Sequence, residues 1–423
     1  MVAHPILLVD LCNSLLQASN PYKYSFQVGM KITKVLYRAI NIPLNFQFSQ
    51  ANNRSARHSS SVILELHLSD GTIGYGEACP RMYVTKESLG SLQKDLKAIA
   101  PQFVTANIDH LEAWKKQLEE WRALGVGTST ICALELAGLD ALAKRDQQSM
   151  SELLDLQAET GSITYSQVIP MLKPDKLAKL LAQIGSLEPS SLKLKASDQM
   201  ADNLANVSLL RACFGDQISI RVDANAGWTA EQAQTFIPAF LAVGINSFEQ
   251  PLAADQLQEL GELTRLFGQN AFIMADESLL DEQGARFLLE NKISNHFNLK
   301  VSKLGGIFSA LAIYQLAASY EVPCQLGAHF GETSLLTAAG ILLTHMAGPM
   351  SANEGALGEF LLEKDIVAPS LAQQANGDLV TDSVLQGIGL APQLNVAVLE
   401  EYTKECYTYQ SYNFDGVVKR LTA

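Results

Sequence analysis

Five charged side chains recur along the chain at nearly even intervals. They are Lys195, Asp223, Glu249, Asp276 and Lys300, and successive members lie about 28, 26, 27 and 24 residues apart. This interval is close to one strand, one helix and the two connecting loops of a (β/α) barrel. Because every strand of such a barrel ends at the same mouth, the spacing predicts that three carboxylates and two amines share one pocket.

The three acids Asp223, Glu249 and Asp276 are hard oxygen donors with no cysteine or histidine cluster beside them. Such a set suits Mg²⁺, whose octahedral coordination would be completed by water and a substrate oxygen, with Mn²⁺ as an alternative and zinc disfavoured. A single acid at a strand end often caps a helix instead. Three acids in register favour the metal site.

The amines suggest proton transfer. Lys193 and Lys195 are two residues apart, so a strand would point both side chains into the barrel mouth, although this short pattern alone is also typical of a solvated edge strand. Two neighbouring ammonium groups and a dication would lower the pKa of one amine enough for it to act as a base. Lys300 would approach from the opposite face. The set could then move the α-proton of a carboxylate substrate, with the cation stabilising the enediolate.

In the N-terminal part of the chain, predicted strands are followed by predicted helices. Residues 29–75 read as strands, with alternation over 61–68 and a hairpin turn at Asp70-Gly71, and residues 88–143 read as helices, including a buried one at 131–142. Strands followed by helices predict an α+β module.

From about Ile163 onward, short β-rich runs alternate with helices, which is typical of parallel βα units. Thr229 and Gln232 form a predicted capping box in one of them. We expect an α/β fold, a (β/α)7β TIM-like barrel over residues 159–367. An α+β capping domain would combine residues 29–158 with 368–423, and residues 1–28 form an N-terminal extension without an assigned role.

Composition excludes several classes of function. The chain has 423 residues, 48% of them hydrophobic, and a formal net charge of −13, which argues against a nucleic-acid partner. No apolar run approaches the roughly 20 residues needed to span a bilayer. Six dispersed cysteines suggest neither a zinc site nor a disulfide framework, and a cytoplasmic location is expected. The apolar run at 5–16 lacks the cationic start of a signal peptide.

The charges lie in short motifs that keep a fixed order: Lys193 with Lys195, Asp223-Ala224-Asn225, Glu249-Gln250-Pro251, Ala275-Asp276-Glu277-Ser278, and Asn298-Leu299-Lys300 through Gly306. With these motifs, the chain from about residue 28 onward resembles the muconate-lactonizing subgroup of the enolase superfamily, within the mandelate racemase and muconate lactonizing enzyme family. That subgroup includes muconate cycloisomerases, o-succinylbenzoate synthases, N-succinylamino acid racemases and dipeptide epimerases.

The resemblance implies roles for individual residues. Asp223, Glu249 and Asp276 would bind Mg²⁺, Lys195 and Lys300 would be the bases on the two faces, and Lys193 would tune Lys195. Side chains expected near the metal or the substrate are Asn225, Glu277, Lys303, His329, Glu332 and Arg57. Arg57 belongs to a predicted mobile loop over residues 50–59 that also carries Arg54 and His58, and a solvated cationic loop is an equal alternative.

Two departures from the family pattern bear on the substrate. His329 stands where many relatives of the subgroup have an apolar residue. Mandelate racemases use a histidine there, but with an aspartate in place of Lys300, so we expect His329 to line the pocket. The eighth-strand region 350–355 lacks the Asp-x-Asp with which many dipeptide epimerases hold an ammonium group, which puts a dipeptide substrate in doubt.

We therefore expect a small-molecule enzyme that abstracts the α-proton of a carboxylate with Mg²⁺. A racemase or epimerase of an N-acylated amino acid or dipeptide-like compound is favoured. A cycloisomerase or syn-dehydratase would need the same residues and stays open, and a mandelate-type acid-sugar dehydratase is disfavoured by Lys300. A catalytically silent metal-binding protein is the alternative of another class. Relatives form dimers or octamers, so a homo-oligomer is left open.

Overall fold

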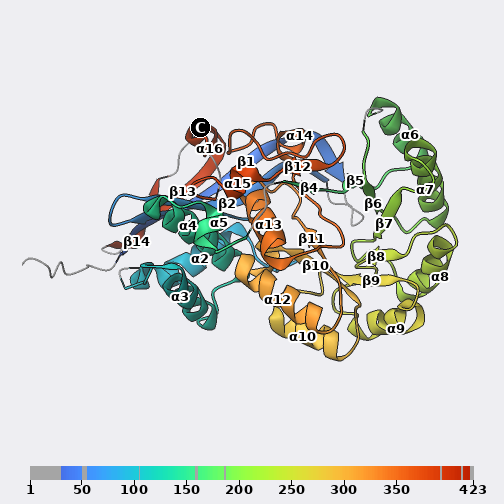
Figure 1. Cartoon of the computed structure of the whole chain (residues 1–423), viewed down its shortest axis with the longest axis horizontal. Helices are drawn as coiled ribbons and strands as arrows, with labels where there is room; N and C mark the ends of the chain where they lie inside the picture. Colours follow the sequence, from blue (N-terminus) through green and yellow to red (C-terminus); the bar gives the residue numbers. More distant parts are fainter. Residues whose placement is uncertain are drawn as a thin grey trace, which may run out of the picture.

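Seven parallel strands form the centre of the molecule, and an antiparallel sheet lies beside them (Figure 1). The computed structural model describes residues 30–49, 55–103, 105–157, 161–184, 187–390, 393–410 and 413–419. The predicted extension 1–28 lies outside these ranges. The parallel strands neighbour one another in chain order: β5 (Gln167–Ile169), β6 (Ser191–Lys195), β7 (Ser219–Asp223), β8 (Ser247–Glu249), β9 (Phe272–Ala275), β10 (His296–Lys300) and β11 (Cys324–Gly327).

Helices alternate with these strands and cover their outer side (Figure 1). They are α6 (Pro174–Gln183), α7 (Met200–Phe214), α8 (Ala230–Leu241), α9 (Leu257–Phe267), α10 (Glu282–Glu290), α11 (Val301–Leu304), α12 (Ile307–Ser319) and α13 (Ser334–Ala347). The predicted capping box at the start of α8 is confirmed, because the side chains of Thr229 and Gln232 each accept from the other's backbone N–H.

The barrel closes through a short extended segment in the eighth position. Leu326 of β11 donates its N–H to Ala352 O over 2.9 Å, and Glu354 N donates to Leu326 O over 2.9 Å. On the other side, Ser166 N donates to Asn353 O over 2.8 Å, next to β5. The backbone polar groups of both edges are thus paired, and the predicted (β/α)7β TIM-like barrel is confirmed.

The second sheet is antiparallel and has the order β14-β13-β1-β2-β3. Its strands are β1 (Ile32–Ser49), β2 (Ser55–Leu68), β3 (Ile73–Ala78), β13 (Thr403–Gln410) and β14 (Asn413–Lys419). Its helices are α2 (Leu89–Ile99), the 3₁₀ turn η1 (Ala100–Gln102), α3 (Leu111–Ala123), α4 (Thr128–Asp146) and α5 (Met150–Leu153). We call this α+β part the cap. The predicted hairpin turn at Asp70-Gly71 and the predicted buried helix, which is α4, are both found.

Glycine allows the buried helix α4 to lie directly on β3. A Cβ at Gly76 would fall 2.1 Å from the carbonyl oxygen of Ala133, and one at Gly74 would fall 2.0 Å from that of Ala137. Any other residue at these two positions would push helix and sheet apart.

The C-terminal part of the chain returns to both units. β12 (Asp378–Val380) pairs with β4 (Ser162–Thr164) beside the barrel, whereas β13 and β14 complete the cap sheet. The remaining short helices are α14 (Gly358–Leu361), α15 (Asp382–Leu385) and α16 (Val396–Tyr402). The domain limits given above stay a prediction. Within the described ranges, no helix is long and apolar enough to cross a bilayer.

Two buried glutamates of the cap hold helix N-termini of the barrel. Glu77, at the end of β3, accepts from the backbone N–H of Thr333 at 3.2 Å and from its hydroxyl at 2.6 Å, where α13 begins. Glu135 of α4 accepts from the N–H groups of Ile307 and Phe308 at the start of α12. The N–H groups at a helix N-terminus have no partner within the helix, so these hydrogen bonds satisfy them and fix the barrel against the cap.

The Glu77 clamp predicts a pH-dependent stability. Burial raises the pKa of Glu77 from 4.5 to about 7, although hydrogen bonds from Thr333 and Ser61 oppose it. The folded state then holds this proton more tightly than the unfolded state. The resulting stability is complete below pH 4.5 and is lost as the pH rises through about 7, a loss of about 3 kcal/mol.

Urea unfolding of the wild type and of Glu77→Gln at pH 4.5 and pH 8 tests this expectation. The variant should gain about 3 kcal/mol relative to the wild type between the two values, because its amide does not ionise. Glu290→Gln, an exposed position on α10, is the control and should show no such relative gain. Equal pH profiles for the wild type and Glu77→Gln would contradict the burial argument.

Candidate active site

The five evenly spaced charges stand together at the C-terminal ends of neighbouring barrel strands. Lys195 ends β6, Asp223 ends β7, Glu249 ends β8 and Lys300 ends β10, whereas Asp276 follows directly after β9. Asp223 and Glu249 are thus the last residues of their strands, whereas Asp276 lies one residue beyond the end of β9. Since β7, β8 and β9 lie between β6 and β10, the two lysines stand on either side of the three acid-bearing strands.

Ion pairs join the lysines to the acids. Lys195 pairs with Asp223 and donates to Asn225 Oδ1 over 2.9 Å. Lys300 Nζ lies 2.5 Å from one carboxylate oxygen of Asp276, and Lys303 Nζ lies 2.8 Å from the other. Burial raises the pKa of Asp276, but the attraction of these two ammonium groups outweighs it and holds the pKa well below its usual range. The acid is therefore ionised.

Lys193 lies deeper than Lys195 and contacts three carboxylates. Its Nζ is 3.2 Å from Glu249 Oε2 and 3.3 Å from Asp223 Oδ2, and it also pairs closely with Glu354. Burial lowers the pKa of Lys193, but these carboxylates raise it well above its usual value. The expectation that neighbouring amines lower each other's pKa thus does not hold for Lys193, because the carboxylates around it outweigh the second amine.

The three acids have the chemistry of a divalent-cation site. Each is at most 1% exposed, and all offer carboxylate oxygens. Burial and the charge of Asp223 raise the pKa of Glu249 to about 8. The surrounding protein groups therefore stabilise the ionised form of Glu249 poorly. Among the described residues, no three acidic, histidine or cysteine side chains form a ready-made metal cage, and ammonium groups of lysine contact each acid. The donor set fits a hard cation.

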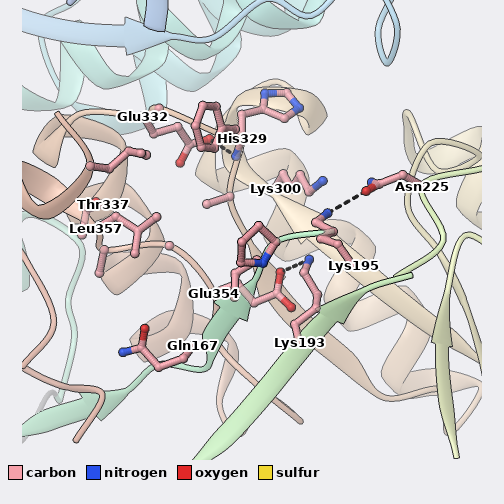
Figure 2. A pocket seen from close by; sticks show the side chains of 18 of the residues that line it. Gln167, Lys193, Lys195, Asn225, Lys300, His329, Glu332, Thr337, Glu354 and Leu357 are labelled. Carbon is pink, nitrogen blue, oxygen red and sulfur yellow. Dashed lines mark hydrogen bonds and ion pairs between the residues drawn. The ribbon is translucent and has the colours of Figure 1, made fainter. Parts of the chain in front are cut away.

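A pocket opens above this charge cluster. Figure 2 shows Lys193, Lys195 and Lys300 entering it from one side, with Glu332, Thr337 and Leu357 on the other. The expected site residues that line the pocket are Lys193, Lys195, Asn225, Glu277, Lys300, His329 and Glu332. The acids Asp223, Glu249 and Asp276, together with Lys303, are buried beneath it.

The predicted loop around Arg57 is wrong for the part that the structure describes. Residues from Ser55 onward belong to β2, and the pairing of Ala56 with Phe48 of β1 extends the hairpin to its tip. Arg57 and His58 are exposed on this strand, and neither lines the pocket. Arg54 lies outside the described residues.

The sequence analysis did not predict two groups of site residues. The first comes from the cap, where Tyr83 and Val84, between β3 and α2, line the pocket. No periodic pattern marks this connection. The cap nevertheless contributes to the site through this loop.

The second group that the sequence analysis did not predict is a layer of polar side chains, located two residues before the strand ends. Arg221 donates to Glu354 over 2.7 Å, Asn298 donates to Glu249 over 2.8 Å, and Gln325 donates to Glu249 over 3.1 Å. The signal was present, because Arg221 precedes Asp223, and Asn298 precedes Lys300, by the same two residues that separate Lys193 from Lys195. The layer fixes Glu249 and Lys193 from below.

Two titratable groups, His329 and Glu332, lie at the upper end of the pocket (Figure 2). His329 is 4% exposed, and no described group hydrogen-bonds to either ring nitrogen. Burial and the charge of Lys300 hold its pKa well below its usual value. Glu332 accepts from the backbone N–H of His329 over 2.6 Å, and burial raises its pKa to about 8. Burial thus disfavours the charged form of both side chains.

Comparison with known families matches both parts of the molecule. Residues 33–155 match the mandelate racemase / muconate lactonizing enzyme N-terminal domain, and residues 176–396 match the enolase C-terminal domain-like family. The first range covers most of the cap, and the second covers the strands that carry the charge cluster.

Curated relatives are isomerases. The chain is 30% identical to the L-Ala-D/L-Glu epimerase of Francisella tularensis subsp. novicida, over 74% of this chain and 86% of that protein. It is 25% identical to the N-succinyl-L-Arg/Lys racemase of Bacillus cereus, over 90% and 99%. Among solved structures, a dipeptide epimerase from Enterococcus faecalis complexed with Mg and L-Leu-L-Tyr superposes with a TM-score of 0.75 at 25% identity, over 85% and 99%.

Proposed function

We propose that this chain, which belongs to the mandelate racemase and muconate lactonizing enzyme family of the enolase superfamily, racemises or epimerises a carboxylate substrate at its α-carbon. It is an isomerase of that family, as the names of its relatives indicate. The substrate we propose is an N-acylated amino acid or a dipeptide-like compound, bound in the pocket between cap and barrel.

The placement of two lysines on opposite sides of the acids carries this proposal. Lys195 comes from β6 and Lys300 from β10, and both line the same pocket. An α-carbon held between them could lose its proton to one amine and regain a proton from the other, which inverts the centre. Lys193, held by Glu249 and Glu354, would orient the charges around Lys195 and fix its side chain.

We propose that Asp223, Glu249 and Asp276 hold Mg²⁺, with Mn²⁺ as an alternative. When bound, the cation would neutralise negative charge that develops on the substrate carboxylate. The buried carboxylate set supports this assignment, and the dipeptide epimerase from Enterococcus faecalis was solved with Mg. Asn225, hydrogen-bonded to Lys195, would keep that amine directed at the pocket.

Unpaired cysteines support a reducing location for the enzyme. Cys79, Cys132, Cys213, Cys324 and Cys406, the cysteines within the described residues, are all free. We therefore place the enzyme in the cytoplasm, acting on a small molecule.

Deuterium incorporation from D₂O tests the proposed function directly. The enzyme is incubated with Mg²⁺ and pools of N-acyl amino acids, dipeptides, hydroxy acids and muconate-like acids, and each pool is read by mass spectrometry. We expect exchange of one α-hydrogen in the N-acyl or dipeptide pool, lost on chelation with EDTA. Exchange in the hydroxy-acid pool alone, or formation of a cyclised or dehydrated product without exchange, would contradict the proposal.

A further inference from the structure

Gln250, the middle residue of the Glu249-Gln250-Pro251 motif, has an unusual backbone conformation next to the site. Its φ is +36, in the left-handed region that residues other than glycine rarely adopt. The residue is also fully buried, with 0% exposure. A strained conformation of this kind persists only where surrounding contacts hold it, so the contacts of Gln250 indicate what the strain maintains.

The carboxamide of Gln250 is hydrogen-bonded at both of its polar atoms. Its Oε1 accepts from the backbone N–H of Asp276 over 2.9 Å, from the backbone N–H of Ser278 over 3.1 Å and from the Ser278 hydroxyl over 2.8 Å. Its Nε2 donates to Leu252 O over 2.9 Å. Backbone N–H groups can only donate, so these partners fix which end of the amide faces Asp276. The side chain therefore ties the end of β8 to the segment after β9.

The backbone of Gln250 makes separate links to the neighbouring strands. Its N–H donates to Met274 O in β9 over 2.9 Å, and its carbonyl accepts from Ala226 N, after β7, over 2.8 Å. Both bonds involve main-chain atoms alone, so they do not depend on the carboxamide. A change of the side chain consequently removes the contacts to Asp276 and Ser278 and keeps the link to Ala226.

Asp276 lacks the strand pairing that holds the other two acids. Asp223 and Glu249 belong to β7 and β8 and lie opposite each other in the register of these strands. The register of β9 with β8 and with β10 stops before Asp276. The backbone N–H of Asp276 is bonded to a side chain, that of Gln250, where a paired strand residue would be bonded to a neighbouring main chain.

We propose that the side chain of Gln250 positions Asp276 to bind Mg²⁺. The carboxamide oxygen holds the backbone at Asp276 and again at Ser278, so it sets the place of the third carboxylate relative to Asp223 and Glu249. Gln250 acts through Asp276 and is a positioning residue, in the way that outer partners orient the ligands of other metal sites. This inference rests on the proposed function, in which Asp276 belongs to the metal set.

Gln250→Met tests the role by Mg²⁺ affinity. Methionine keeps the length of the side chain but leaves the donors of Asp276 and Ser278 without their acceptor. We expect a loss of about 10–100-fold in isothermal titration calorimetry without substrate, the range for indirect partners of a metal ligand. Gln117→Met is the matched control, since Gln117 is also buried and accepts from a backbone N–H, that of Asn107, but lies in the cap. It should bind Mg²⁺ as the wild type does. Unchanged affinity in Gln250→Met, or an equal loss in Gln117→Met, would overturn the inference.

Two further variants separate positioning from a general loss of stability. Ser278→Ala removes one donor and keeps the backbone, and it should lower Mg²⁺ affinity about two- to tenfold, as expected for one lost hydrogen bond. Gln250→Glu keeps an acceptor for all three donors and should retain most of the affinity that Gln250→Met loses. Equal losses in Gln250→Glu and Gln250→Met would contradict the role of the oxygen. If Gln250→Met does not fold, Ser278→Ala decides, and wild-type affinity in that variant refutes the inference.

Exchange kinetics provide a readout that a loss of stability would not change. Asp276 pairs with Lys300, whereas Lys195 pairs with Asp223. Displacement of Asp276 should therefore disturb Lys300 and leave Lys195 in place. At saturating Mg²⁺, Gln250→Met should lower kcat for α-deuterium exchange at least about tenfold more for the enantiomer that Lys300→Met affects than for the other. Equal losses for both enantiomers would contradict positioning through Asp276.

The Mg²⁺ measurements separate failure of this inference from failure of the proposed function. They need no substrate, so a selective loss of affinity in Gln250→Met supports the inference even where no substrate pool shows exchange and racemisation is refuted. Exchange by the wild type together with unchanged Mg²⁺ affinity in Gln250→Met leaves the proposed function standing and refutes the inference. A wild type that binds no Mg²⁺ contradicts both the inference and the proposed metal site.

Discussion

Replacing either Lys195 or Lys300 by methionine should abolish α-hydrogen exchange from one enantiomer of the substrate and leave exchange from the other. Each variant is expected to lose about 10³-fold or more in the affected direction, within the usual range for removal of a general acid or base. The two variants should be mirror images of each other. Racemisation itself should be lost in both, because it needs both amines.

The expected asymmetry follows from strand order. Lys195 and Lys300 end strands that are separated by three others, and the carboxylates of those strands lie between them. A carboxylate substrate held over the acids then presents one face of its α-carbon to each lysine. Methionine keeps much of the length and apolar stem of lysine, so the pocket should keep its shape.

The measurement uses each pure enantiomer in D₂O, with mass spectrometry for exchange and chiral chromatography for inversion. Lys179→Met, at an exposed position on α6, is the control and should leave both rates unchanged. If both active-site variants lose exchange with both enantiomers although substrate still binds, one lysine is the base and the other only assists. That outcome would favour the cycloisomerase or syn-dehydratase alternative.

Strand-end charges were the part of the site that the sequence predicted best. A barrel forces one residue per strand to its mouth, so Lys195, Asp223 and Glu249 could be placed from their spacing alone. The same rule places Lys300 at the barrel mouth. Asp276 is the exception, because β9 ends at Ala275 and Asp276 lies one residue beyond it. The spacing of charges does not report where a strand's hydrogen bonds stop.

Contacts between distant parts of the chain could not be predicted in this way. Tyr83 reaches the pocket because Glu77 and Glu135 hold the cap on two barrel helices, and no local pattern encodes that docking. Arg57 was misplaced for the related reason that the hairpin of β1 and β2 is longer than its alternating core suggested. Local periodicity predicted the helices and strands, but the docking of the cap on the barrel determines which side chains lie in the pocket.

The pairing of lysines and acids adds a contribution to the pKa of Lys193 that the sequence analysis did not include. Two adjacent amines should depress each other's pKa when they are considered alone. In the structure, Lys193 lies against Glu249, Glu354 and Asp223, and their attraction dominates. Glu354 was the missing element, since it enters from the closing segment, 161 residues away from Lys193 in the chain.

Glu249→Gln should reduce the affinity for Mg²⁺ at least about 100-fold, because it removes one carboxylate ligand with little change of shape. Mutation of a residue that only hydrogen-bonds to a metal ligand already lowers metal affinity about 10–100-fold. Isothermal titration calorimetry with Mg²⁺ and no substrate measures this without relying on activity. The wild type should also unfold at a higher temperature with excess Mg²⁺, and Glu249→Gln should lose that increase. A cation that binds only the folded state stabilises it by about 2.7 kcal/mol at 100 times its Kd.

Glu354→Gln provides the matched control for this prediction. Glu249 and Glu354 are both buried and both pair with Lys193, yet only Glu249 belongs to the proposed metal set. Among the described residues, Glu354 reaches the proposed metal set only through Lys193 and Gln325. Glu354→Gln should therefore lower Mg²⁺ affinity by no more than about tenfold, the lower end of the range for indirect partners and well below the loss expected for a direct ligand. Equal losses in both variants would mean that the charge of the network, and not direct coordination by Glu249, controls binding. A wild type that binds no Mg²⁺ would contradict the proposed metal site itself.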